Sequence, residues 1–155
     1  MVKNMNEEMK KKYDELKEKN RITSIQKSWG NNVLLQECIE STGAKVLPYN
    51  DGNKISEEIQ SKIPFSNGRL DFSRFKYKNN INAVSTISEL INSSTEFYIM
   101  WDEANLPCLK LELKKIIKFI DDITCVSCDT WVVSSDYNTV IEFYHEKEIM
   151  LCILS

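Results

Sequence analysis

Apolar residues in the first third of the chain recur at helical spacing. The first set is Met5, Met9, Tyr13 and Leu16. These positions stand three or four residues apart in a segment rich in Glu and Lys, which predicts a peripheral amphipathic helix with one modest apolar stripe. A second helix is predicted from residue 31 or 32 onward, because Gly43 stands where a left-handed C-terminal cap is expected.

The middle of the chain alternates short apolar runs with turn residues. Residues 44–49 are predicted to form a short strand, and the sequence Asn-Asp-Gly-Asn at residues 50–53 is typical of a turn. Ile55, Ile59 and Ile63 then predict a helix that ends before a proline. Helical spacing resumes over residues 83–91.

The C-terminal part has the clearest pattern. Residues 97–101 read as a strand and residues 102–105 as a turn. A helix follows, with Pro107 near its start and an apolar stripe over residues 109–120 that faces the sheet. Three more strands are predicted at residues 123–133, 139–145 and 148–154. Their connections are as short as hairpin loops, so we expect an antiparallel meander.

These elements predict an α+β fold in a single domain spanning residues 1–155. Residues 1–94 form a mostly helical part, and its helices pack with a mainly antiparallel sheet of β-α-β-β-β order from residues 95–155. A chain of 155 residues with 42% hydrophobic and 28% charged residues suits one globular core. The first residues lack the apolar stretch of a secretory signal and no run reaches membrane-spanning length, so we expect a cytoplasmic protein that does not bind membranes.

Alternation along the predicted strands assigns side chains to the two faces of the sheet. Val126, Cys128, Thr130, Val132, Ile141 and Phe143 are expected on a core face, and Ser127, Asp129, Trp131, Glu142 and Tyr144 on the other. Aromatic residues among acids are typical of a recognition surface, where rings anchor a partner and charges steer it. Alternatively, the first helices of the chain cover this face and bury its aromatics.

Charge is unevenly distributed. The net charge is −3, yet residues 95–155 carry eleven Asp and Glu against five Lys, and residues 1–94 have a net charge of +3. Nucleic-acid binding requires clustered Lys and Arg, so the acidic part favours a basic protein as partner and disfavours nucleic acid. For any single one of these acids, solvation of the outer face of the sheet is the better explanation.

Residues 65–80 interleave aromatic and basic side chains. The members are Phe65, Arg69, Phe72, Arg74, Phe75, Lys76, Tyr77 and Lys78. Such a mixture is found in platforms that bind nucleic acid. The segment is short and lacks a flanking basic helix, so we favour a loop or edge strand that is anchored by its aromatics while its basic side chains stay solvated.

Residues for metal binding or catalysis are scarce. The five cysteines are an odd number in apolar surroundings, and Cys125 and Cys128 are expected to point to opposite faces of a strand. His145 is the only histidine, and the four glycines form no phosphate-binding motif. Asp102 and Glu103 are adjacent carboxylates that serve more often as solvated turn residues than as a catalytic pair. We therefore expect no enzyme activity, no metal and no cofactor.

Three strings in the C-terminal part carry a family resemblance. They are YIMWDEANLPCLK at residues 98–110, DDITCVSCDTWVV at residues 121–133 and VIEFYHE at residues 140–146. From residue 97 onward the chain resembles the immunity proteins of bacterial contact-dependent growth inhibition systems. This resemblance implies a cytosolic, non-enzymatic inhibitor that binds the C-terminal toxin domain of a delivered effector, commonly a nuclease. It assigns no interface residue by motif.

The acidic C-terminal part is the expected contact with a basic toxin cleft. The candidate partner-binding residues are Trp101, Asp102, Glu103, Asp129, Trp131, Asp136, Tyr137, Glu142 and Tyr144. A cytosolic regulatory or scaffold module that uses the same sheet face is the alternative function. A small nucleic-acid-related enzyme using residues 65–80 is the third.

Overall fold

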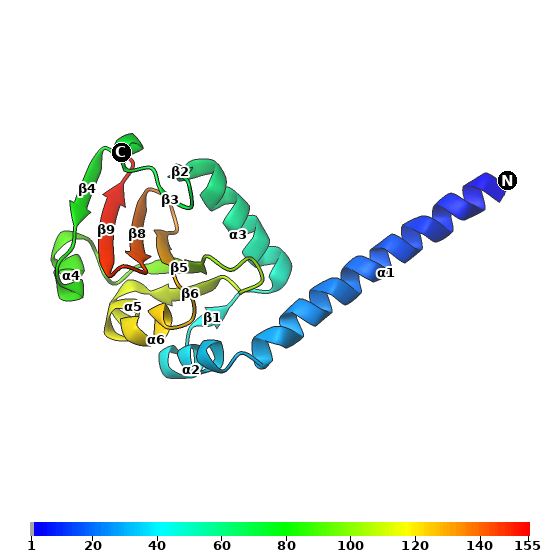
Figure 1. Ribbon diagram of the computed structural model, residues 1–155, viewed down its shortest axis with the longest axis horizontal. Coiled ribbons are helices and arrows are strands. Elements are labelled where there is room, and N and C mark those ends of the chain that lie inside the picture. Colours follow the sequence, from blue (N-terminus) through cyan, green and yellow to red (C-terminus); the bar gives the residue numbers. More distant parts are fainter. Residues whose placement is uncertain (1) are drawn as a thin grey trace.

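A seven-stranded antiparallel sheet is the centre of the fold (Figure 1). The structure is a computed structural model that describes residues 2–155, with side chains from residue 6 onward. In spatial order the strands are β1 (Lys45–Val46), β6 (Leu109–Glu112), β5 (Glu96–Trp101), β7 (Thr130–Ser134), β8 (Thr139–Tyr144), β9 (Glu148–Ile153) and β4 (Tyr77–Asn80). A separate hairpin consists of β2 (Phe65–Ser66) and β3 (Arg69–Leu70).

Helices cover both faces of the sheet. The α-helices are α1 (Val2–Gly30), α2 (Val33–Thr42), α3 (Tyr49–Lys62), α4 (Ile87–Leu90), α5 (Leu113–Lys118) and α6 (Ile120–Thr124), and the 3-10 helices are η1 (Phe72–Arg74) and η2 (Val84–Thr86). On one face, α2, α4, α5 and α6 pack around buried residues such as Leu35, Ile99 and Ile116. On the other face, α3 and the β2–β3 hairpin cover Trp131 and Val140.

The predicted α+β class and the C-terminal meander are confirmed. Strands β7, β8 and β9 are antiparallel neighbours, with Val132 opposite Ile141 and Ile141 opposite Leu151. In the β7–β8 turn Tyr137 adopts a φ of 59°, and its N–H donates to the Ser134 carbonyl at 2.9 Å. This local bond closes the hairpin and fixes its register.

Helix α2 has the boundaries that its sequence predicts. The Asn32 side chain accepts a hydrogen bond from the N–H of Leu35 at 3.0 Å, which caps the first turn. Gly43 has a φ of 67° and its N–H donates to the Ile39 carbonyl at 2.9 Å. A glycine adopts this left-handed conformation without a Cβ penalty, so it ends the helix.

The predicted helix over residues 109–120 is wrong in its first part. Leu109–Glu112 is strand β6, and helix α5 begins at Leu113. Leu109, Leu111 and Leu113 also alternate, with Leu109 and Leu111 buried, and pairing with β5 on one side and β1 on the other satisfies the backbone. The strand pattern therefore prevailed over the helical spacing.

The first meander strand is shorter than predicted. Residues 123 and 124 belong to α6, residues 125–129 form a loop, and β7 begins at Thr130. The Trp101 Nε1–H donates to the Ile123 carbonyl at 3.0 Å, which attaches the end of α6 to β5. This long-range bond favours the helix where the sequence alone suggested a strand.

Smaller differences concern the middle of the chain. The predicted turn at residues 50–53 is the first turn of α3, the strand at residues 44–49 shrinks to β1, and the helix at residues 83–91 is divided into η2 and α4. Both β1 and β4 come from residues 1–94 and form the edges of the sheet. The expected mostly helical part therefore also contributes strands.

Helix α1 projects away from the rest of the molecule (Figure 1). Its predicted apolar stripe does not pack at the periphery, because Met9, Tyr13 and Leu16 are 66%, 64% and 57% exposed; Met5 lies outside the described side chains. Contacts with the body begin near the C-terminal end of α1, where Arg21 Nη2 donates to the Tyr49 hydroxyl at 3.1 Å. None of the described helices meets the length and hydropathy needed to cross a membrane.

We expect a truncated protein that begins at residue 18 to fold as the full chain does. The removed side chains from residue 6 onward are exposed, so the free energy of unfolding should change by less than about 0.5 kcal/mol. Urea unfolding of both proteins measures the difference. Trp29→Ala is the matched control, because Trp29 is buried and its Nε1–H donates to the Asn105 carbonyl at 2.6 Å. A large loss on truncation would mean that the projecting part of α1 packs against the body.

Candidate functional site

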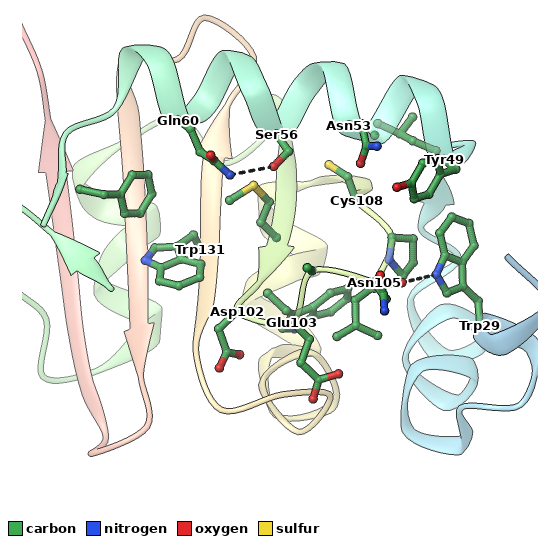
Figure 2. A pocket seen from close by; sticks show the side chains of 18 of the residues that line it. Trp29, Tyr49, Asn53, Ser56, Gln60, Asp102, Glu103, Asn105, Cys108 and Trp131 are labelled. Atoms are coloured by element: carbon green, nitrogen blue, oxygen red, sulfur yellow. Dashed lines mark hydrogen bonds between the residues drawn. The ribbon is translucent and has the colours of Figure 1, made fainter. Parts of the chain in front are cut away.

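A groove of about 840 Å³ lies between α3 and the β5–β6 loop, residues 102–108 (Figure 2). Met100 of β5 lies on the face that α3 covers and forms its floor, and Trp131 and Phe65 stand at one end. Trp101 also lines the groove, although its side chain packs in the core on the other face of the sheet. Further lining residues are Arg21, Trp29, Leu47, Tyr49, Gly52, Asn53, Ser56, Gln60, Gly68, Asp102, Glu103, Ala104, Asn105, Leu106, Pro107 and Cys108. Polar and apolar groups contribute to its surface in similar measure, and a concave site with converging polar groups is a usual form of a binding site.

The α3 wall of the groove is polar because α3 is amphipathic. Ile59 is fully buried against the sheet. Asn53, Ser56 and Gln60 lie on the groove side, and Gln60 Nε2 donates to Ser56 Oγ at 3.3 Å. This wall therefore offers amide and hydroxyl groups without formal charge.

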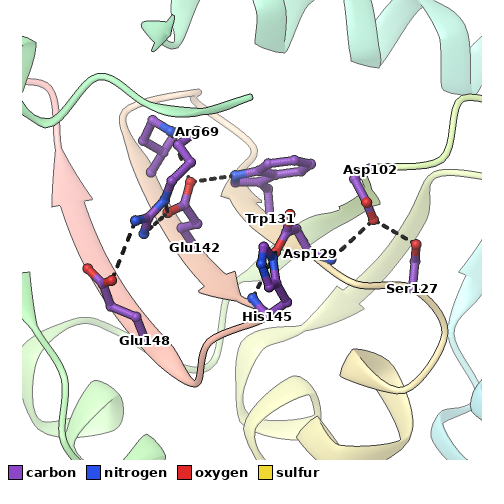
Figure 3. A network of polar contacts seen from close by, with 9 residues as sticks. Arg69, Asp102, Ser127, Asp129, Trp131, Glu142, His145 and Glu148 are labelled. Carbon is purple, nitrogen blue, oxygen red and sulfur yellow. Dashed lines mark hydrogen bonds and ion pairs between the residues drawn. The ribbon is translucent and has the colours of Figure 1, made fainter. Parts of the chain in front are cut away.

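The opposite wall presents two carboxylates at the start of the β5–β6 loop. Asp102 Oδ1 accepts from Ser127 Oγ at 2.6 Å and from the N–H of Asp129 at 3.1 Å (Figure 3). The backbone N–H of Asp102 in turn donates to the Asp129 carbonyl at 3.3 Å. The adjacent Glu103 is exposed, and its side chain makes no hydrogen bond or ion pair with the described residues. Asp102 is thus held in place, while Glu103 is free to meet a partner.

Asp129 is largely buried and already paired. Its Oδ1 accepts from the backbone N–H of His145 at 2.8 Å and lies 2.9 Å from His145 Nδ1 (Figure 3). The expectation that Asp129 is exposed on an open face is wrong. It joins the loop before β7 to the β8–β9 turn, and so supports the end of the sheet where Asp102 and Glu103 lie.

Glu142 is fully buried and accepts four hydrogen bonds (Figure 3). Arg69 donates to Oε1 from Nε at 2.9 Å and from Nη2 at 2.6 Å. The N–H of Leu70 and the Trp131 Nε1–H donate to Oε2 at 2.9 and 3.0 Å. These four donors satisfy the hydrogen-bonding needs of the buried carboxylate. Because Arg69 and Leu70 belong to β3, the same bonds attach the β2–β3 hairpin to the sheet.

The expected open face with Trp131, Glu142 and Tyr144 is therefore covered. Trp131 is 7% exposed and meets Phe65 edge to face, with ring centroids 5.6 Å apart. Tyr144 is half-buried, and the Arg69 guanidinium carbon lies 3.7 Å from its ring centroid. The alternative of a covered face is correct, but α3 and the β2–β3 hairpin cover it rather than the first helices. Trp101 is also buried, at 6% exposed.

Asp136 and Tyr137 lie at the other end of the sheet from Asp102. Residue 97 pairs with residue 134, and residue 101 with residue 130, which places the β7–β8 turn and the β5–β6 loop at opposite ends of β5. The Ser134 hydroxyl and the N–H of Asn138 donate to Asp136, and these bonds hold the pKa of its carboxyl below the usual value. The candidate residues therefore do not form one cluster.

The aromatics of residues 65–80 anchor that segment, as expected. Phe75 is buried, Phe65 contacts Trp131, and β4 forms an edge of the sheet. Arg74, Lys76 and Lys78 are exposed as expected, but Arg69 is half-buried and bonded to Glu142, so the expectation that all the bases stay solvated is wrong. The segment therefore forms a hairpin and an edge strand attached to the sheet.

The five cysteines differ from the prediction in one respect. Cys38, Cys108 and Cys152 are buried, but Cys125 and Cys128 are exposed in the loop before β7. Placing Cys128 on the core face is wrong, because the strand that would have carried it there begins only at Thr130. Burial raises the pKa of Cys108 to about 12, which keeps this thiol protonated.

Residues on α3 and α1 line the groove, and nothing in their sequence context had marked them as candidates. Gln60, Ser56 and Asn53 look like ordinary solvated helix positions, and Trp29 ends a long charged helix. The apolar stripe of α3 is the sequence feature that could have pointed to this wall. A helix with Ile59 on one side must pack that side against a sheet. The polar side of the same helix then becomes a wall.

One family model, described as CdiI immunity protein, EcoliA0-like, matches residues 32–152 of the chain. The chain belongs to this CdiI family. No curated protein matches it. As a CdiI protein it is an immunity protein of contact-dependent growth inhibition, which neutralises a toxin, and such proteins are typically not enzymes.

The CdiI match contains the whole sheet up to Cys152 and most of the groove. Helix α1 precedes the match, yet two of its residues, Arg21 and Trp29, line the groove. One end of the groove is therefore built by an element outside the matched region.

Proposed function

We propose that this CdiI protein neutralises a nuclease toxin domain by binding its basic, nucleic-acid-binding cleft with the end of the sheet that carries Asp102 and Glu103. The observation that supports this most is the pair of exposed carboxylates beside the groove between α3 and the β5–β6 loop. A nuclease must hold phosphates with cationic groups, and an acidic surface fits the same groups. Charge complementarity of this kind accelerates association and selects the partner.

The surroundings of these carboxylates add to the argument. The three connections that end near them are the β5–β6 loop, the loop before β7 and the β8–β9 turn, which also brings the exposed Glu146. Asp102 and Asp129 fix the first two connections to each other, and Asp129 and His145 fix the second to the third. A partner would meet an ordered surface, which lowers the entropy lost on binding.

The direct test measures protection and association kinetics with the toxin domain that the neighbouring gene encodes. Co-expression with wild-type protein should restore growth. Glu103→Lys should slow association severalfold and weaken its dependence on salt, because an attractive charge becomes repulsive.

Glu96→Lys is the matched control. It makes the same change of charge on an exposed residue at the opposite end of β5 from Glu103, which follows that strand in the β5–β6 loop. If both variants associate as the wild type does, the acidic end of the sheet does not face the toxin. If Glu96→Lys alone is slow, the toxin binds near Asp136 and Tyr137 instead.

A further inference from the structure

The groove between α3 and the β5–β6 loop has the features of a site for an extended peptide segment (Figure 2). It is elongated between two walls, with Trp131 toward one end and Trp29 toward the other. One wall is the polar side of α3, and the other carries Asp102 and Glu103. Extended segments are recognised by polar groups that meet their backbone and by pockets for alternate side chains.

The apolar surfaces of the groove are held in place before any partner arrives. Trp131 is fixed through its Nε1–H to Glu142, at 3.0 Å. Trp29 is fixed through its Nε1–H to the carbonyl of Asn105, at 2.6 Å. Rigid aromatic groups provide contact area at low conformational cost, which is typical of residues that dominate binding energy.

The charge of the groove selects a cationic occupant. Arg21 is the only Lys or Arg among the lining residues, and Glu18 neutralises it through an ion pair of 2.6 Å. Asp102 and Glu103 have no cationic partner among the described residues. The groove therefore carries two uncompensated negative charges next to an apolar floor.

We propose that this groove binds one extended segment of the toxin, in which an Arg or Lys side chain pairs with Asp102 and Glu103 while a neighbouring apolar side chain rests on Met100 and Trp131. The proposal rests on the proposed function, since the segment belongs to the toxin. It adds that recognition depends on a single inserted segment as well as on the acidic surface. The amide of Gln60 and the hydroxyl of Ser56 meet the backbone of that segment.

Blocking the groove tests the proposal. Gln60→Trp places an indole on the α3 wall, at an exposed position that tolerates substitution. Binding of a catalytically inactive form of the neighbouring gene's toxin domain should weaken by a factor of about 100 or more, as expected when a central anchor of an interface is lost. Ser61→Trp is the matched control, because Ser61 is exposed on α3 but does not line the groove. It should bind as the wild type does.

A double-mutant cycle identifies the cation. Each Arg and Lys of the toxin domain is changed to Ala and combined with Glu103→Gln. One of these positions should show coupling with Glu103, and the others should be additive. Circular dichroism of Gln60→Trp verifies that the fold is retained.

The outcomes separate the two proposals. Wild-type protein that gives no protection overturns the proposed function itself. Protection by wild type together with unchanged affinity of Gln60→Trp overturns the groove proposal alone. If Gln60→Trp binds weakly but no toxin cation couples with Glu103, the proposal of a cationic segment is overturned. The groove would then bind a segment without a cation at that position.

Discussion

Glu142→Ala should lower the free energy of unfolding by about 3 to 5 kcal/mol, the usual cost of breaking a buried ion pair. The substitution leaves the Arg69 guanidinium, which is 26% exposed, without its main acceptor. It also leaves the Trp131 Nε1–H and the N–H of Leu70 without theirs. Buried donors that lose their acceptors keep their full desolvation cost. Urea unfolding at neutral pH measures the loss.

Two further variants identify the cause of the stability loss in Glu142→Ala. Glu148→Gln is the mild control, because Glu148 is a weaker partner of Arg69, at 3.4 Å, and is partly exposed. Arg69→Met combined with Glu142→Leu should recover part of the loss, since both charges are removed together. Recovery should be incomplete, because the two neutral N–H groups still lack acceptors. A Glu142→Ala protein as stable as wild type would show that the β2–β3 hairpin is not held by this network.

The same substitution should weaken toxin binding if the groove is the site. Phe65 and Gly68 line the groove and belong to the hairpin region that Glu142 fastens. A loosened hairpin would leave one end of the groove undefined, and the toxin would have to order it on binding. On this proposal Glu142 acts from a buried position, by holding the hairpin, whereas the sequence suggested a direct contact.

Local patterns predicted the parts of the fold whose contacts are close in sequence. The meander followed from three apolar runs with short connections, and the end of α2 followed from Gly43. The boundary at Leu109 could not be found in this way, because Leu109, Leu111 and Leu113 fit a strand while Leu109, Leu113 and Ile116 fit a helix. Pairing with β5 decided between them, and that contact is not visible in a local window.

The candidate site was predicted only in part, again because the sequence shows local patterns and not long-range contacts. Asp102 and Glu103 were expected in a turn after a strand, and they lie there, exposed. Strand alternation correctly placed Trp131 and Glu142 on one face, but it does not tell what covers that face. The answer depended on where α3 packs, and only the packed structure brings Gln60 opposite Glu103 across a groove (Figure 2).

Trp101→Ala should also lower the free energy of unfolding by about 3 to 5 kcal/mol, the range for removing a large buried aromatic side chain. Trp101 is 6% exposed within the core formed with α2, α5 and α6. Its Nε1–H donates to the carbonyl of Ile123 at 3.0 Å, so the variant also frees the end of α6. Chemical unfolding measures the change, and the protection of cells should fail at high growth temperature and recover at low temperature.

Trp101→Phe decides whether Trp101 acts through the fold or through contact with the toxin. It keeps most of the buried ring and removes the hydrogen bond, so the expected loss of stability is about 1 to 2 kcal/mol. The affinity for the toxin domain should stay within about twofold of wild type, because the side chain is buried in the core on the other face of the sheet from α3. A folded Trp101→Phe protein with tenfold weaker binding would instead mean that the toxin reaches the indole, and that the floor of the groove opens when the segment enters.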